Sequence, residues 1–185
     1  MKESAFNKLF WGFLLIMLSF RIQGFDIFPD IVGYLLFASA FNDLASSSNF
    51  FSIASKYNIP MIVLSIFSIY QRPVQSGEIS FNVLGVLGIP IAIAAFVLTL
   101  LVVYNLFMGI KDMAEKQGQF ELAKESVESW NKYKLLMIAI ACALLFALIP
   151  FLGIFYIVFI IIVSIIITVS ILRFIKRCGE NLTIL

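Results

Sequence analysis

The chain of 185 residues contains no histidine. This absence excludes bis-imidazole haem ligation, histidine-containing zinc sites and acid or base catalysis by an imidazole. Charged residues are also scarce, at 13% of the chain, against about 25% in a typical soluble domain. The two cysteines, Cys142 and Cys178, have no CxxC spacing, and they predict neither a disulfide nor a redox role.

Motifs that would mark an enzyme are missing as well. The sequence has no Gly-rich phosphate loop, no HExxH or GxSxG motif and no carboxylate-rich metal motif, so we expect no catalytic residue, no metal ligand and no cofactor. No block of like charge gives a footprint for nucleic acid. The sequence alone therefore assigns no reaction.

What the chain does have is apolar length, with 62% hydrophobic residues. Residues 135–172 contain no Asp, Glu, Lys or Arg over 38 positions, and Pro150 and Gly153 interrupt them near the middle. A helix needs about 20 apolar residues to cross a hydrocarbon core of roughly 30 Å. Because backbone polar groups in lipid must be satisfied internally, this stretch predicts a hairpin of two transmembrane helices.

The same criteria predict an all-α fold, a single polytopic bundle of about six transmembrane helices over residues 1–185. An amphipathic cytoplasmic connector is expected at residues 111–132, where Asp112 and Lys116 form an i,i+4 pair. The six helices are expected at residues 4–23, 29–46, 49–71, 81–110, 133–149 and 154–175.

The third helix has two alternative geometries, because Pro60 lies within it. It is either continuous with a kink at Pro60, or residues 49–57 lie at the interface and a short helix crosses after them. We favour the kinked helix, because residues 60–71 would span only about 18 Å at 1.5 Å per residue.

Charge asymmetry predicts the orientation. With six crossings and both termini in the cytoplasm, eleven of the 13 basic residues fall on the cytoplasmic side, and only Arg21 and Arg72 fall outside. This distribution follows the positive-inside rule. The cytoplasmic residues would be Lys2, Lys8, Lys56, Lys111, Lys116, Lys124, Lys132, Lys134, Arg173, Lys176 and Arg177.

A candidate site for a ligand or a partner lies on the opposite side. Arg21, Asp26 and Asp30 cluster before the second helix, and Arg72 and Glu78 lie in the next outer loop. Two carboxylates and a guanidinium could hold a cation, a polar headgroup or a basic group of a partner. A structural interpretation also accounts for them, through the helix dipole, turn formation and snorkelling.

Asp43 and Lys56 are a candidate intramembrane ion pair. Both would lie near the inner interface if the second and third helices form a hairpin at residues 46–49. Ionisable groups at membrane depth tend to pair or to face a cavity. We favour a pair that locks the hairpin over a proton or cation site at Asp43.

Residues 24–34 read Gly-Phe-Asp-Ile-Phe-Pro-Asp-Ile-Val-Gly-Tyr. This segment resembles a Gly-(Phe/Ile)-Asp-Ile-Leu-Pro-Asp-Phe-Ile-Gly-Tyr segment of uncharacterised small polytopic membrane proteins of Gram-positive bacteria. The resemblance covers about 11 residues and implies a multi-pass protein of the bacterial cytoplasmic membrane. It marks Asp26, Pro29, Asp30, Gly33 and Tyr34 as the positions to test first.

Two functions remain open. The chain length and the six-helix threading resemble the substrate-binding subunits of energy-coupling-factor transporters, which favours a non-enzymatic component that binds or transports a small molecule. The alternative is an accessory or regulatory subunit of a larger membrane complex. Besides the lipid bilayer, the expected partners are a membrane protein or a second copy of this chain.

Overall fold

A computed structural model describes residues 2–17, 21–22, 25–26, 30–68, 88–146 and 150–182. Within these residues the chain forms six helices and one pair of two-residue strands, which confirms the all-α prediction at this level. The elements are α1 (Lys2–Met17), β1 (Arg21–Ile22), β2 (Phe25–Asp26), α2 (Asp30–Leu44), α3 (Asn49–Ser68), α4 (Gly88–Lys116), α5 (Phe120–Phe146) and α6 (Pro150–Asn181).

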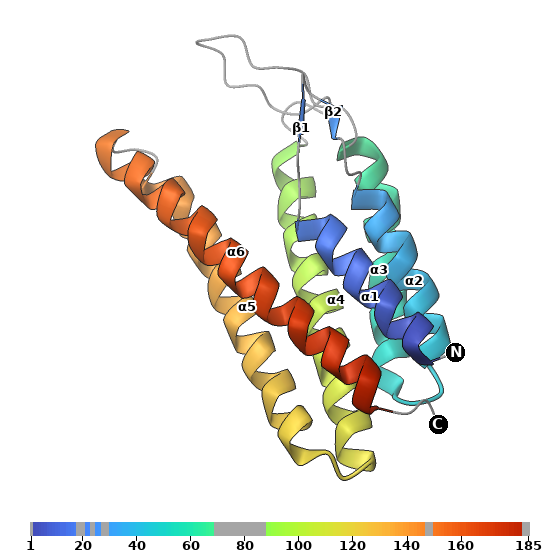
Figure 1. Ribbon diagram of the computed structural model, residues 1–185. Coiled ribbons are helices and arrows are strands. Elements are labelled where there is room, and N and C mark those ends of the chain that lie inside the picture. Colours follow the sequence, from blue (N-terminus) through green and yellow to red (C-terminus); the bar gives the residue numbers. More distant parts are fainter. Residues whose placement is uncertain are drawn as a thin grey trace.

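The helices form a closed ring. Each helix packs on its neighbours in the sequence, and α6 returns to pack on α1. The start of α1 and the end of α6 lie at the same end of the bundle as the α2–α3 and α4–α5 turns (Figure 1). An even number of helices joined in an up-and-down order gives this arrangement.

The predicted first helix extends beyond the end of α1. It was expected to continue to residue 23, whereas α1 ends at Met17 and Arg21–Ile22 forms a strand. β1 pairs with β2 in antiparallel fashion, with Arg21 opposite Asp26 and Ile22 opposite Phe25. Because this pairing uses extended backbone, a helix cannot include these residues.

The third helix is continuous. α3 runs through Pro60 without interruption. This agrees with the prediction of one continuous helix and not with a separate short helix that begins after residue 57. Proline lacks an N–H group and removes one hydrogen bond from the helix, but packing on neighbouring helices can hold such a segment together.

The predicted connector at residues 111–132 is not a separate element. α4 continues to Lys116, and α5 begins at Phe120. The predicted pair of Asp112 with Lys116 supports the end of α4, with the Lys116 ammonium 2.8 Å from the carboxylate. The helices are joined at Gly118, which has a φ of 70°; the amide of Gln119 donates to the carbonyl of Ala114 at 2.8 Å, as in a Schellman motif.

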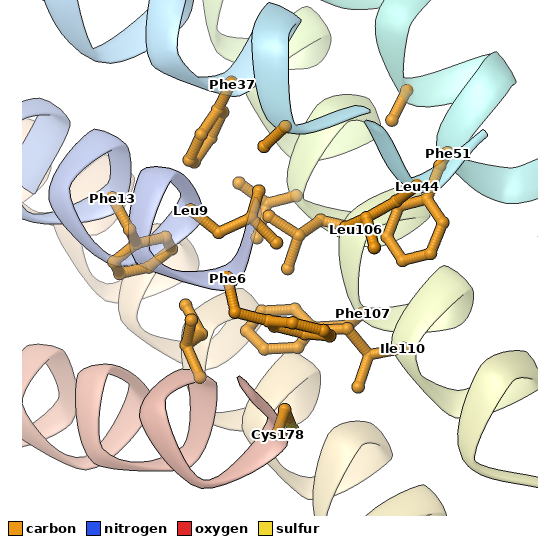
Figure 2. Packing of buried hydrophobic residues seen from close by; sticks show 14 of the residues in the cluster. Phe6, Leu9, Phe13, Phe37, Leu44, Phe51, Leu106, Phe107, Ile110 and Cys178 are labelled. Atoms are coloured by element: carbon orange, nitrogen blue, oxygen red, sulfur yellow. The ribbon is translucent and has the colours of Figure 1, made fainter. Parts of the chain in front are cut away.

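The buried apolar core lies in the half of the bundle that holds the chain termini. All six helices contribute to it, and Figure 2 shows Phe6 and Leu9 of α1 facing side chains of α2 and α4, with Cys178 of α6 below them. The largest fully buried side chains are Tyr133, Phe6, Phe13, Phe37, Phe41, Phe51, Phe107, Phe174, Leu9, Leu44, Leu106 and Ile110.

α1 and α2 approach closely through two glycines. A Cβ atom on Gly12 would lie 2.9 Å from the carbonyl oxygen of Gly33, and a Cβ atom on Gly33 would lie 2.8 Å from the carbonyl oxygen of Gly12. Real Cβ atoms are not found that close to backbone oxygens, so the helices can be this near only because both residues lack a side chain.

The other half of the bundle exposes apolar side chains. α5 and α6 lean away from the other helices toward the end opposite the termini (Figure 1). Two segments in the described part of the chain, Pro90–Lys116 and Gly153–Asn181, are long and apolar enough to cross a membrane. Only 28% and 11% of their most apolar windows are buried. Since the core helix of a soluble protein is mostly buried, these two helices suggest association with a membrane.

Candidate functional site

The predicted outer site is described in part. Arg21 and Asp26 are opposite each other in the β1–β2 pair, and Asp30 is the first residue of α2. Arg72 and Glu78 lie outside the described residues. The structure thus brings the backbones of Arg21 and Asp26 together, and their joint role as a site stays a prediction.

Asp43 has a different partner from the predicted one. The ammonium of Lys8 lies 2.6 Å from the Asp43 carboxylate and donates a second hydrogen bond to the hydroxyl of Ser39 at 2.9 Å. Lys56, the predicted partner, has an exposed side chain on α3. The packing of α1 on α2 places Lys8 beside Ser39 and Asp43 in the last turns of α2. The pair joins α1 to α2 instead of joining α2 to α3.

A polar cluster lies between α2, α3 and α4, and it consists of Tyr34, Asn58, Met61 and Thr99. The hydroxyl oxygens of Tyr34 and Thr99 are 3.4 Å apart. The Thr99 hydroxyl also lies 4.0 Å from the sulfur of Met61. Tyr34 and Asn58 are buried. Together with the contact of Asn58 to the Tyr34 backbone, these contacts link one residue of α2, two of α3 and one of α4.

The Asn58 amide makes one hydrogen bond and leaves one group unused. Its Nδ2 donates to the backbone carbonyl of Tyr34 at 2.8 Å. Because two carbonyl oxygens cannot bond each other, this contact fixes which end of the amide is nitrogen. No donor in the described part of the chain reaches Asn58 Oδ1, although the side chain is fully buried.

Such an acceptor is unusual. Most buried polar atoms have a partner, and a buried group without one destabilises the folded state by about 1–3 kcal/mol. A carbonyl oxygen can accept from an N–H or O–H group, so the atom suits a ligand that carries such a donor. Within the described residues no three Asp, Glu or Cys side chains come together as metal ligands.

Asn58 lies about halfway along α3, whereas Tyr34 lies in the second turn of α2. Asn58 is nine residues after the start of α3 at Asn49, about 14 Å along the helix axis. Tyr34 is ten residues before the end of α2 at Leu44, about 15 Å along its axis. The two positions therefore match in height above the α2–α3 turn.

Only one member of this cluster could be predicted from the sequence. Tyr34 was singled out through the resemblance of residues 24–34, whereas Asn58, Met61 and Thr99 were not. The available signal was an amide two residues before Pro60 inside an apolar segment. No family model, curated protein or solved structure matches the chain, so its function has to be argued from the residues themselves.

Proposed function

We propose that the chain is a six-span membrane protein with both ends in the cytoplasm. Two observations support this threading: the termini share one end of the bundle with the α2–α3 and α4–α5 turns, and eleven of 13 basic residues belong to segments at that end. The helices α1 and α2 have only 16 and 15 residues. Local thinning of the bilayer accommodates spans shorter than the hydrocarbon core.

Cysteine labelling tests the threading. In a variant with Cys142→Ala and Cys178→Ala, we expect a membrane-impermeant maleimide to label Ser76→Cys in intact cells. It should label Gln119→Cys, in the exposed α4–α5 turn, only after permeabilisation. Labelling of both positions in permeabilised cells is the control. Labelling of Gln119→Cys in intact cells would refute the threading.

Within this threading, we propose that the protein is a non-enzymatic component that binds or transports a small molecule. The observation that carries the proposal is the unpartnered Oδ1 of the buried Asn58. At about 14 Å from the cytoplasmic turn, it would lie near the middle of a hydrocarbon core of roughly 30 Å. Bulk water does not reach the hydrocarbon core, so a bound molecule that carries a donor would satisfy Oδ1.

The chemistry of the cluster defines the class of ligand. Asn58 offers an acceptor, and the hydroxyls of Tyr34 and Thr99 each can donate or accept. The four residues of the cluster are uncharged, and a buried charge without a partner is strongly unfavourable. The arrangement therefore fits a small neutral molecule with a hydroxyl or amide donor.

Native mass spectrometry of the gently extracted protein tests the site. We expect a retained small molecule in the wild type and its loss in Asn58→Leu. Asn105→Leu is the matched control, because Asn105 is also a buried amide and donates to Leu101 of its own helix at 2.7 Å. A wild-type protein without any bound molecule, or equal retention in Asn58→Leu, would contradict the proposal.

The alternative function, a subunit of a larger complex, has its own support. Over residues 154–166 of α6, most side chains are exposed and apolar, including Phe155 at 76% and Phe159 at 61%. Either lipid or the helices of another protein could cover them. A stoichiometric protein partner without a small molecule in the same experiment would favour this alternative.

A further inference from the structure

The contact between α1 and α6 contains a second candidate site, distinct from the polar cluster around Asn58. Where the start of α1 meets the end of α6, a cavity of about 550 Å³ opens at the end of the bundle that holds the termini. Its volume is within the range of ligand pockets, about 300–1,000 Å³. The residues that bear on its chemistry are Phe6, Asn7, Phe10, Trp11, Lys176 and Glu180.

The two helices contribute different chemistry to the cavity. α1 provides the aromatic side chains of Phe6, Phe10 and Trp11, and α6 provides the charged side chains of Lys176 and Glu180. Trp11 is 50% exposed. Tryptophan is typical of the boundary between headgroups and hydrocarbon, where its ring is in contact with both. The cavity is therefore amphipathic and suits a molecule with a polar head and an apolar tail.

Two charged side chains of α6 form no ion pair with the other described residues. Lys176 and Glu180 are one helical turn apart, but neither belongs to any of the ion pairs formed by the described residues. The neighbouring Arg177, by contrast, pairs with Glu125 of α5. A cation and a carboxylate thus line the same cavity, and both are exposed.

We propose that this cavity binds the headgroup of phosphatidylethanolamine from the cytoplasmic leaflet. The phosphate would bind the Lys176 ammonium, and the primary ammonium of the lipid would bind the Glu180 carboxylate. The acyl chains would lie along Phe10 and Trp11. The proposal uses the threading given above but does not rest on ligand binding at Asn58.

Charge complementarity selects this lipid among the common ones. Phosphatidylglycerol has no cation for Glu180, and phosphatidylserine adds a carboxylate that Glu180 would repel. The quaternary ammonium of phosphatidylcholine has no N–H to donate to a carboxylate, whereas charge-assisted hydrogen bonds are the stronger ones. Only the zwitterion with a primary ammonium satisfies both side chains.

Because the cavity lies between α1 and α6, a bound lipid would affect the packing of these two helices. α6 approaches α1 closely here, and a Cβ atom on Gly179 would lie 2.9 Å from Cβ of Phe6. A lipid held between Trp11 of α1 and Lys176 of α6 would contact both helices. Since a ligand that binds only the folded state stabilises it, phosphatidylethanolamine should strengthen the contact that closes the ring.

The test is lipid competition on the intact protein in detergent micelles, followed by native mass spectrometry. Synthetic phosphatidylethanolamine, phosphatidylcholine and phosphatidylglycerol are supplied in equal amounts. We expect the wild type to retain phosphatidylethanolamine roughly two- to fivefold more than phosphatidylcholine, the ratio expected for one exposed charge pair. Water-soluble phosphoethanolamine should not displace the lipid at equal concentration, because it lacks the acyl chains.

Two variants separate the roles of the charges. Glu180→Gln should abolish the preference for phosphatidylethanolamine over phosphatidylcholine, and Lys176→Gln should lower the retention of both lipids. Glu128→Gln and Lys132→Gln are matched controls, because both side chains are exposed on α5 and outside this cavity. A preference that survives in Glu180→Gln, a wild type that favours phosphatidylglycerol, or displacement by phosphoethanolamine would each overturn the proposal.

Discussion

Truncation of Phe107 to alanine is expected to lower the free energy of unfolding by about 3–5 kcal/mol, as for other buried phenylalanines. Phe107 is fully buried in α4, and its ring centroid lies 6.2 Å from that of Phe174 in α6. Removing the phenyl group would leave a cavity in the buried core shown in Figure 2, where α4 packs against other helices of the bundle. The measurement is the unfolding of the protein by denaturant in mixed micelles.

Phe155→Ala is the matched control for this experiment. Phe155 is 76% exposed on α6, so the same truncation should change the free energy of unfolding by less than about 0.5 kcal/mol, as at other exposed positions. A large loss at Phe155 would mean that its ring is buried by something other than lipid or detergent. Equal effects at both positions would contradict the location of the core.

Replacement of Gly12 by valine is expected to separate α1 from α2 and to destabilise the protein by at least about 1–3 kcal/mol, the usual range for overpacking. The new side chain would meet Cδ1 of Phe37 at 2.7 Å and the carbonyl oxygen of Gly33 at 2.9 Å. The ring of Phe37 can rotate, but the backbone of α2 can move only as a whole. A thermal shift of the solubilised protein measures the loss.

Ala94→Val serves as the control for added volume on a helix. Ala94 is exposed on α4, so its larger side chain should meet no protein atom and leave the melting temperature unchanged. Gly12→Ala should give an intermediate loss. If Gly12→Val melts at the wild-type temperature, the close approach of α1 and α2 is wrong.

The sequence was sufficient to predict the helices that consist of long, uninterrupted apolar segments. Residues 135–172 predicted a hairpin, and the described parts of α5 and α6 fill that segment. The continuity of α3 through Pro60 followed from length alone, because residues 60–71 are too few to cross a membrane. The pairing of Asp112 with Lys116 followed from spacing within one helix.

Contacts between helices could not be derived in this way. The pairing of Asp43 with Lys8 depends on the register of α1 against α2, which the close contact of Gly12 and Gly33 helps to set. The importance of Asn58 depends on an absence, the missing donor for Oδ1, which can be recognised only when its surroundings are known. Single-sequence periodicity contains neither kind of information.

The β1–β2 pair and the α4–α5 turn illustrate a different difficulty. Arg21 and Ile22 follow an apolar helical segment without any charge between them and Leu9, so nothing in the hydropathy marks the end of α1. At the other turn, Gly118 was the available signal for a helix end. The polar residues around it predicted a helical, amphipathic connector at residues 111–132, whereas the ends of α4 and α5 themselves form this segment and turn at Gly118.

The order of helix contacts also bears on how the protein is made. Because α1 through α5 each pack on the next helix along the chain, the bundle can assemble in the order of synthesis, with each new span finding its partner already inserted. The contact of α1 with α6 is the exception, since four helices lie between these two along the chain. Until α6 is inserted, the side of Phe6 that faces Gly179 stays exposed, although α1 already packs on α2, and such transiently exposed apolar surface favours association with other chains.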